Sequence, residues 1–289
     1  MNERLTAADV VAKMKRSLGS GWTESSADGF QTGSPDTLVT GVAVAWTPTL
    51  EVLRKAVAEK KNFIVTKEGP FWEDSGGRLE QGVSGRSPKA LIEGTNLYRF
   101  KQDYLLRHDL VVWRFSANWD QTNRDFGLKG LAAALGWEKQ ADTAMENSLG
   151  AIGAAEYTVP TTTLLELIQM LKQRLKMNAP RALGDPSARI QKVVLCPGFL
   201  TKLNMMAIQS HSKPDAVLCG DACEWEAFEY CEDLITAGWS KAMVLLGLAA
   251  SQDPGAKQVA AWVDSLALSL PISYIETGSP FTPVAGRQL

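Results

Sequence analysis

The stretch VTGVAVAWTPTLEVLRKAVAEKKNFIVTKEGPFW, residues Val39–Trp72, decides the fold of this chain. Val42–Trp46 is a short apolar run between turn signals, which is typical of a buried strand. Thr47 and Pro48 then predict a helix start, because threonine can accept from the free amides of a first helical turn and proline loses no hydrogen bond there. A second apolar run, Phe63–Thr66, follows the helix. The pattern predicts a strand–helix–strand unit with parallel strands and a right-handed crossover.

Polar residues follow the second of these strands directly. Lys67 and Glu68 come where the apolar run stops, before Gly69-Pro70. Sheets of this kind bind ligands beyond the carboxyl ends of their strands. We therefore look for function at Lys67 and Glu68 first.

Composition narrows the class of protein. The chain has 289 residues, of which 45% are hydrophobic, with 30 basic and 32 acidic side chains. There is no long basic run and no apolar segment of the ~18 residues that span a membrane, so we expect neither a nucleic-acid nor a membrane partner. Four cysteines without a C-x-x-C motif are typical of free thiols in a reducing compartment, which predicts a cytoplasmic protein. Only two histidines, His108 and His211, are present, so the chain has few of the imidazole ligands that most transition-metal sites use.

The second half of the chain echoes the opening unit. Val193–Cys196 predicts a strand, Pro197-Gly198 a turn, Phe199–Gln209 a helix, and Ala216–Cys219 a second strand that ends near an acid. In this alignment Asp221 matches Glu68. A strand, turn, helix, strand and acid that recur in order indicate two similar half-domains.

We therefore predict an α/β fold with two related half-domains, mixed sheets flanked by helices, and a cleft between the halves. The predicted halves are residues 1–140 and 141–289, and the C-terminal strands are candidates for packing back on the first half. Residues 19–35, polar and rich in Gly and Ser, are predicted to form a surface loop.

Polar residues gather at four predicted strand ends, which would converge if the two sheets face one another. They are Lys67 and Glu68; Ser116 and Asp120; Asp221 and Glu224; and Ser251, Gln252 and Asp253. Several carboxylates in one cleft are tolerated if they bind a cation or pair with a lysine or arginine. The group therefore predicts a metal or substrate site, and the alternative interpretation is a row of solvated acids at loop starts.

The chain resembles the Nif-three-like dinuclear metal-centre protein family, also known as the type 2 homologue of GTP cyclohydrolase I. The segments that carry the resemblance occur in the family's order and span nearly the whole chain. They are GVAVAWTPTLEVLRKA with NFIVTKEGPF, VVWRFSANWD, RALGDPSARIQKVVLCPG, DAVLCGDACEWEA, VLLGLAASQ and YIETGSPF. The resemblance implies two α/β halves around two metal ions, and subunits assembled into hexameric rings.

The chain departs from the family's ligand pattern at the first two strand ends. The first normally carries His-His, or His-Glu in one branch, where this chain has Lys67 and Glu68. The second normally carries a His and, four residues later, an Asp or His, where this chain has Ser116 and Asp120. Only Glu68 and Asp120 therefore remain as metal ligands that the resemblance implies.

The last motif of the family, Gly-His-x-x-Ser/Thr-Glu, is also altered. Leu248 stands in place of its His and Gln252 in place of its Glu. An ammonium and an isobutyl group cannot coordinate a cation, and an amide oxygen is a poor substitute for a carboxylate. We expect no dinuclear centre and no cofactor. The weaker option is one divalent cation, Mg²⁺ or Ca²⁺, held by Glu68 and Asp120 with Asp221 or Asp253.

Three functions remain open at this stage. The first is a ligand-binding homo-oligomer, expected to be a hexamer, with a vestigial metal site, an unidentified small-molecule ligand and weak or no catalysis. The alternative is a cyclohydrolase-like, metal-dependent hydrolase that acts on a nucleotide or phosphorylated small molecule. It would use Glu68 and Asp120 around one metal, or Lys67 as an electrophile toward phosphate, so Lys67 and Asp120 are the catalytic candidates. The third is a protein-interaction module that works through the ring surface.

Overall fold

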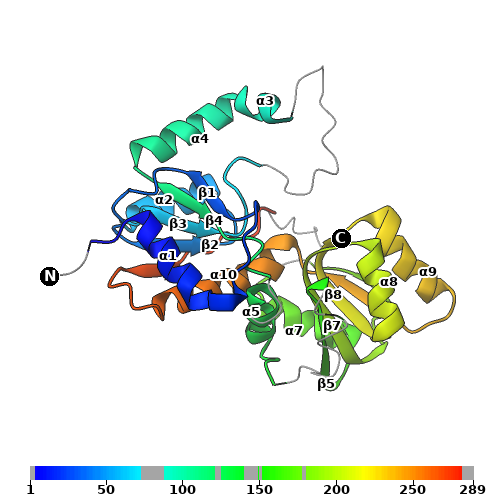
Figure 1. Cartoon of the computed structure of the whole chain (residues 1–289). Helices are drawn as coiled ribbons and strands as arrows, with labels where there is room; N and C mark the ends of the chain where they lie inside the picture. Colours follow the sequence, from blue (N-terminus) through cyan, green and yellow to red (C-terminus); the bar gives the residue numbers. More distant parts are fainter. Residues whose placement is uncertain are drawn as a thin grey trace. The chain divides into compact units, whose positions relative to one another are not determined.

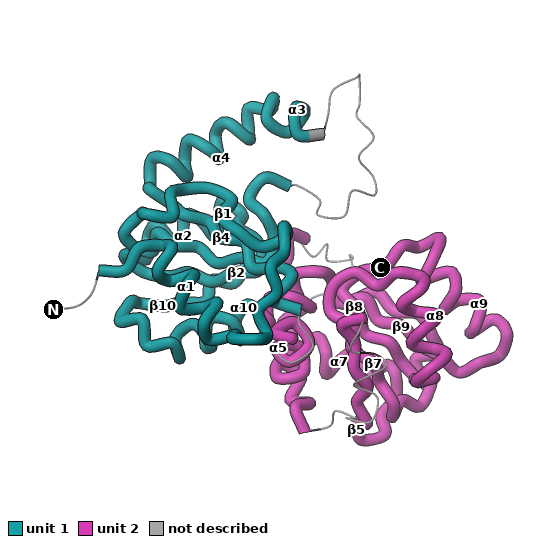
Figure 2. Tube along the Cα trace, in the orientation of Figure 1, with its two compact units in different colours: residues 1–121, 256–277 teal, residues 122–255, 278–289 magenta. Residues whose placement is uncertain are grey.

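The computed structural model describes residues 4–72, 88–120, 125–139, 149, 152–177 and 180–281. The chain divides into two compact units (Figure 2), unit 1 with residues 1–121 and 256–277 and unit 2 with residues 122–255 and 278–289. Each unit contains one mixed sheet flanked by helices (Figure 1), so the predicted α/β class is confirmed. The predicted boundary between residues 140 and 141 lies outside the described residues.

The sheet of unit 1 has the strand order β1-β4-β3-β2-β10. Its strands β2, β3, β4 and β10 are parallel, and the polar strand β1 pairs antiparallel with β4 at one edge. The parallel pairing of the two strands predicted first, β2 and β3, is confirmed. The strands are β1 Gly29–Thr32, β2 Val42–Ala45, β3 Phe63–Thr66, β4 Val111–Arg114 and β10 Ile272–Tyr274.

Helices of unit 1 pack on the sheet according to the alternation of its side chains. α2 (Leu50–Ala58) and α4 (Asn96–Arg107) share an apolar cluster with Ala43, Ile64 and Val112. Trp113 and Phe115 point to the opposite face, where their rings stack with Trp22, and Phe115 also stacks on Trp262. The remaining helical elements are α1 Ala7–Leu18, a 3₁₀ turn Gly19–Gly21, α3 Pro88–Glu93 and α10 Leu248–Asp264, inside which the unit boundary falls.

The sheet of unit 2 has the order β5-β7-β8-β9-β6, with β7, β8 and β9 parallel. One face packs against α5 and α7, and the other against α8 and α9. The strands are β5 Ala155–Thr163, β6 Arg181–Leu183, β7 Arg189–Leu200, β8 Ala216–Ala222 and β9 Ala242–Leu245. The helices are α5 Phe126–Leu135, α7 Leu164–Arg174, α8 Lys202–His211, a π-helix Glu224–Phe228 and α9 Glu229–Thr236.

The two units repeat the topology of four of their strands. In each, a short strand (β1 or β6) precedes three parallel strands and pairs antiparallel with the last of them (β4 or β9). At equivalent rungs, meaning rows of residues paired across neighbouring strands, unit 1 has Ala45, Thr66 and Arg114. Unit 2 has Cys196, Cys219 and Leu245. Glu68 and Asp221 each lie two residues beyond the central member of their rung, so they occupy equivalent places.

Three local predictions were wrong. The helix α2 is capped by Thr49, whose hydroxyl accepts from the Val52 amide at 3.2 Å, and not by Thr47. The expected loop at residues 19–35 contains β1, which gains its backbone partners from β4. The expected turn at Pro197-Gly198 lies inside β7, and the next helix begins after Thr201, whose hydroxyl accepts from the Asn204 amide.

Within the described part of the chain, no helix combines the length and the apolar character needed to cross a membrane.

Candidate functional site

The carboxyl ends of β3 and β4 bring Lys67 and Asp120 together. The Lys67 ammonium donates to both carboxylate oxygens of Asp120, at 2.7 Å and 2.6 Å. Lys67 is 7% exposed, whereas 46% of the Asp120 side chain is exposed. A buried ammonium needs an opposite charge, and Asp120 supplies it from the solvent side.

Glu68 is paired with an arginine that the sequence analysis had not singled out. Arg114, the last residue of β4, lies 3.8 Å from a Glu68 carboxylate oxygen and is 7% exposed. Its Nε also donates to the backbone carbonyl of Lys67 at 3.3 Å. Both residues that were predicted as metal ligands, Glu68 and Asp120, are therefore bound to internal cations.

We call Lys67–Trp72, which leaves the end of β3, the post-β3 segment. The carbonyl of Trp46, at the end of the neighbouring strand β2, accepts from the amides of both Lys67 and Glu68 at 3.1 Å. The indole Nε1 of Trp46 is buried and finds no hydrogen-bond acceptor among the described residues. Trp46 therefore holds the start of the post-β3 segment through its carbonyl. The same residue carries an indole N–H without an acceptor among the described residues.

Lys101 reaches the same segment from α4. Its ammonium donates to the Pro70 carbonyl at 2.5 Å and lies 5.4 Å from the centroid of the Trp72 ring, at cation–π distance. The residue is 3% exposed, and burial lowers the pKa of Lys101 to about 8. No ion pair with a carboxylate joins Lys101 within the described residues.

Asp28 orders the turn that presents Asp120. Its carboxylate accepts from the backbone amides of Ser116, Ala117 and Asn118, the last two at 3.0 Å and 3.2 Å, and also from the Asn118 side chain. Three successive amides around one carboxylate form an anion-binding arrangement whose anion belongs to the protein itself. The sequence analysis placed Asp28 in a loop and gave it no role.

In unit 2, Asp221 and Glu224 share one arginine. Arg181 of β6 donates to both, in each case at 3.1 Å. Asp221 is the equivalent of Glu68, so each unit neutralises the acid at this place with an arginine. The two arginines come from different strands, β4 in unit 1 and β6 in unit 2.

Ser251, Gln252 and Asp253 were expected in a loop after a strand, but they lie inside α10 and are buried. The Ser251 hydroxyl accepts from the Gly198 amide at 3.2 Å and donates to the Leu248 carbonyl at 2.9 Å. Asp253 accepts from the Gly278 amide at 3.0 Å. Ser251 and Asp253 therefore link backbone segments of unit 2, and the Asp253 carboxylate already accepts a hydrogen bond from a backbone amide.

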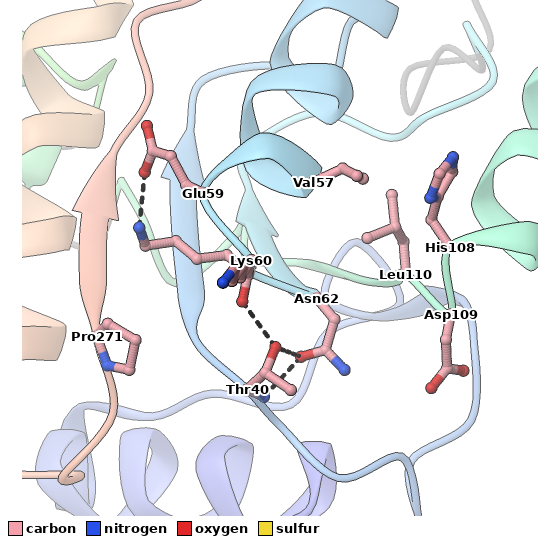
Figure 3. A pocket seen from close by; sticks show the side chains of 10 residues that line it. Thr40, Val57, Glu59, Lys60, Asn62, His108, Asp109, Leu110 and Pro271 are labelled. Carbon is pink, nitrogen blue, oxygen red and sulfur yellow. Dashed lines mark hydrogen bonds and ion pairs between the residues drawn. The ribbon is translucent and has the colours of Figure 1, made fainter.

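A pocket of about 610 Å³ lies at the opposite, amino-terminal edge of the unit 1 sheet (Figure 3). Its polar groups bond one another: Thr40 donates to the Lys60 carbonyl at 2.8 Å, and Lys61 donates to Glu59 at 2.6 Å. None of the site residues predicted from the sequence lines it. Its lining is Thr40, Val57, Glu59, Lys60, Lys61, Asn62, His108, Asp109, Leu110 and Pro271.

The donor set does not fit a dinuclear transition-metal centre. The described residues contain no group of three or more His, Cys, Asp or Glu side chains that could hold a metal ion. Asp120 directs both carboxylate oxygens at the Lys67 ammonium, and a cation beside that ammonium would meet a like charge. Leu248 has no ligating atom at all. The chemistry of unit 1 at this edge is that of ion pairs.

Solved structures with the same fold cover nearly the entire chain. Protein SA1388 from Staphylococcus aureus matches with a TM-score of 0.70 and 19% identity, over 98% of this chain and 100% of its own. Protein ybgI, of unknown function, gives a TM-score of 0.73 and 17% identity, over 96% of this chain and 100% of its own. A Bacillus cereus protein related to NIF3 gives 0.70 and 14%, over 98% of this chain and 100% of its own. At these identities the likeness establishes the fold.

A search of curated proteins found no match. The family model described as Duf34/NIF3 (NGG1p interacting factor 3) matches residues 6–238, which is most of the chain. With the repeated α/β units and these structural relatives, that match shows that the chain belongs to the Duf34/NIF3 family.

Proposed function

We propose that this NIF3-family protein is a ligand-binding protein whose metal centre has been replaced by internal cations. The observation that carries the proposal is the pair between the Lys67 ammonium and both oxygens of Asp120. Arg114 plays the same part for Glu68. The two carboxylates that would attract metal ions are then held by charges that the chain itself supplies.

The replacement is supported by a comparison of charge and geometry. A lysine ammonium is a compact point charge with three donors, so it can satisfy a bidentate carboxylate without any metal. It cannot, however, activate water or polarise a carbonyl in the way that a bound cation does. Hydrolysis through metal-bound water is therefore not part of this proposal.

Metal analysis tests the proposal directly. The chain, purified without a metal-affinity step and then incubated with Zn²⁺, Mn²⁺ or Fe²⁺, is desalted and analysed by elemental mass spectrometry. We expect no stoichiometric metal. Two bound transition-metal ions per chain overturn the proposal and favour the alternative function, a metal-dependent hydrolase.

A matched variant makes a negative result informative. Lys67→His, Ser116→His, Leu248→His and Gln252→Glu, combined in one chain, restore the ligand types of the family pattern while they keep Glu68 and Asp120. We expect this variant to retain metal under the conditions in which the native chain does not. If the variant folds but also fails to bind metal, the four positions are not the remains of a metal site.

The oligomeric and cellular parts of the proposal need separate measurements. We propose a homohexamer in the cytoplasm, from the family resemblance and the unpaired-thiol composition respectively. Light scattering coupled to size-exclusion chromatography gives the mass, for which six chains of 31.4 kDa are expected. Cell fractionation of the tagged full chain tests the compartment.

A further inference from the structure

The post-β3 segment is approached by three buried cations. Lys67 pairs with Asp120, and Arg114 pairs with Glu68. Lys101 donates to a neutral backbone carbonyl, that of Pro70. It is the most buried of the three cations and the one without a carboxylate partner in the described part of the chain.

The hydrogen-bonding capacity of Lys101 is only partly used. An ammonium has three donors, and one of them reaches the Pro70 carbonyl. The Trp72 ring covers the charge at 5.4 Å but accepts no conventional hydrogen bond. A buried ammonium in this state is costly, which is why burial lowers the pKa of Lys101 to about 8.

A second donor without an acceptor belongs to a residue that bonds this segment through its backbone. Trp46, whose carbonyl anchors Lys67 and Glu68, carries the buried indole N–H that has no acceptor among the described residues. The Pro70 carbonyl bound by Lys101 lies three residues from the Lys67 carbonyl bound by Arg114, a separation of at most ~10 Å even for extended chain. The Asp28 carboxylate, which holds the turn before Asp120, is occupied by the amides of Ser116, Ala117 and Asn118.

We propose that the post-β3 segment binds a small oxyanion, of the sulfate and phosphate type or of the carboxylate type, with Lys101 as its principal ligand. The anion supplies the missing counter-charge and accepts the unused ammonium hydrogens, and Trp72 covers the bound group. The inference rests on the proposed function, because a site filled by internal cations selects anions and one filled by carboxylates selects metals.

Calorimetric titration with sulfate and with malonate tests this. Neither probe carries an appreciable titratable proton at pH 8, so a proton taken up on binding moves from the buffer to a group of the protein. An anion beside Lys101 favours the charged amine, so we expect uptake of up to about half a proton per bound anion at pH 8. It is read from the dependence of the binding enthalpy on the ionisation enthalpy of the buffer.

Variants assign the proton and the affinity to one residue. Lys101→Met keeps the length and apolar stem of the side chain, and we expect at least about tenfold weaker binding and no proton uptake. Lys101→Arg retains the charge and should retain binding without proton uptake. Lys89→Met, at an exposed lysine of α3, is the matched control and should behave as the native chain.

The result separates the two anion types and the two proposals. Binding of sulfate or of malonate with uptake that Lys101→Met abolishes supports the site and names the type. No saturable binding of either probe, or equal binding by the native chain and Lys101→Met, overturns it. The metal content of the protein is measured before every titration. That metal analysis alone tests the proposed function, and the titrations test the anion site.

Discussion

The Lys67 ammonium and the Asp120 carboxylate form a bidentate ion pair, with N–O distances of 2.7 Å and 2.6 Å, across the ends of β3 and β4. The pair is asymmetric, because the cation is buried and nearly half of the carboxylate side chain is exposed. Loss of either partner therefore leaves a charge in a different environment. This asymmetry makes the pair experimentally useful.

Asp120→Asn is expected to destabilise the chain more than Lys67→Met. The first removes the Asp120 charge from beside a buried ammonium, which we expect to cost about 2–3 kcal/mol, less than for a pair buried on both sides. The second leaves a half-exposed carboxylate that water can solvate, at a cost of about 1 kcal/mol or less. Urea unfolding with equal m-values measures both.

The exposed Glu51→Gln, which breaks a surface pair with Lys55 in α2, is the control for that comparison and should change little. Equal losses for Asp120→Asn and Lys67→Met would show that the burial of Lys67 does not govern the energetics of the pair.

Asp28→Asn should loosen the turn before Asp120. The substitution keeps the shape but removes the charge and one acceptor oxygen that the amides of residues 116–118 share. We expect a loss of about 1–3 kcal/mol in the free energy of unfolding, from amides left unsatisfied. The same change at the exposed Asp36 serves as the reference. If Asp28→Asn is as stable as Asp36→Asn, the carboxylate does not hold the turn.

The lowered pKa of Lys101 predicts that the free energy of unfolding changes at alkaline pH. The pKa of Lys101 is about 8 in the folded chain and near its ordinary value of 10.5 when unfolded. Below about pH 8 both states hold the proton, and the full cost of burying the charge is present. Between about pH 8 and pH 10.5 the unfolded state binds more protons, so stability rises with pH.

The measurement is the difference in unfolding free energy between the native chain and Lys101→Met from pH 7 to pH 10. We expect this difference to move in favour of the native chain as the pH rises, by about 2.5 kcal/mol between pH 7 and pH 10. Parallel profiles for the two proteins would contradict the pKa assigned to Lys101.

The central strands of each sheet could be predicted from the sequence, but the edge strands β1 and β6 could not. β2, β3, β8 and β9 are short apolar runs, and their burial on both faces makes the pattern unambiguous. β1 (GFQT) and β6 (RAL) have no such pattern, because each is held by backbone pairing with one neighbour. The first turns of α10 were also missed, since Pro254 and the small polar residues around it lower local helix propensity.

The site shows the same division. Lys67, Glu68 and Asp120 were found because they follow strands or match a family pattern. Arg114, Lys101 and Asp28 bond partners 47, 31 and 88 residues away in sequence, and nothing local indicated the roles of Lys101 and Asp28. One signal was available: Arg114 is a charge within the apolar strand VVWRF, and a charge in a buried strand requires a partner.

The repeated units suggest how such a chain could diverge. Glu68 and Asp221 occupy equivalent places, yet Arg114 and Arg181 reach them from strands that are not equivalent. The two arginines therefore do not correspond to one another in the repeated topology. Each copy balances its own acid within its own sheet, so selection can alter one copy without a compensating change in the other.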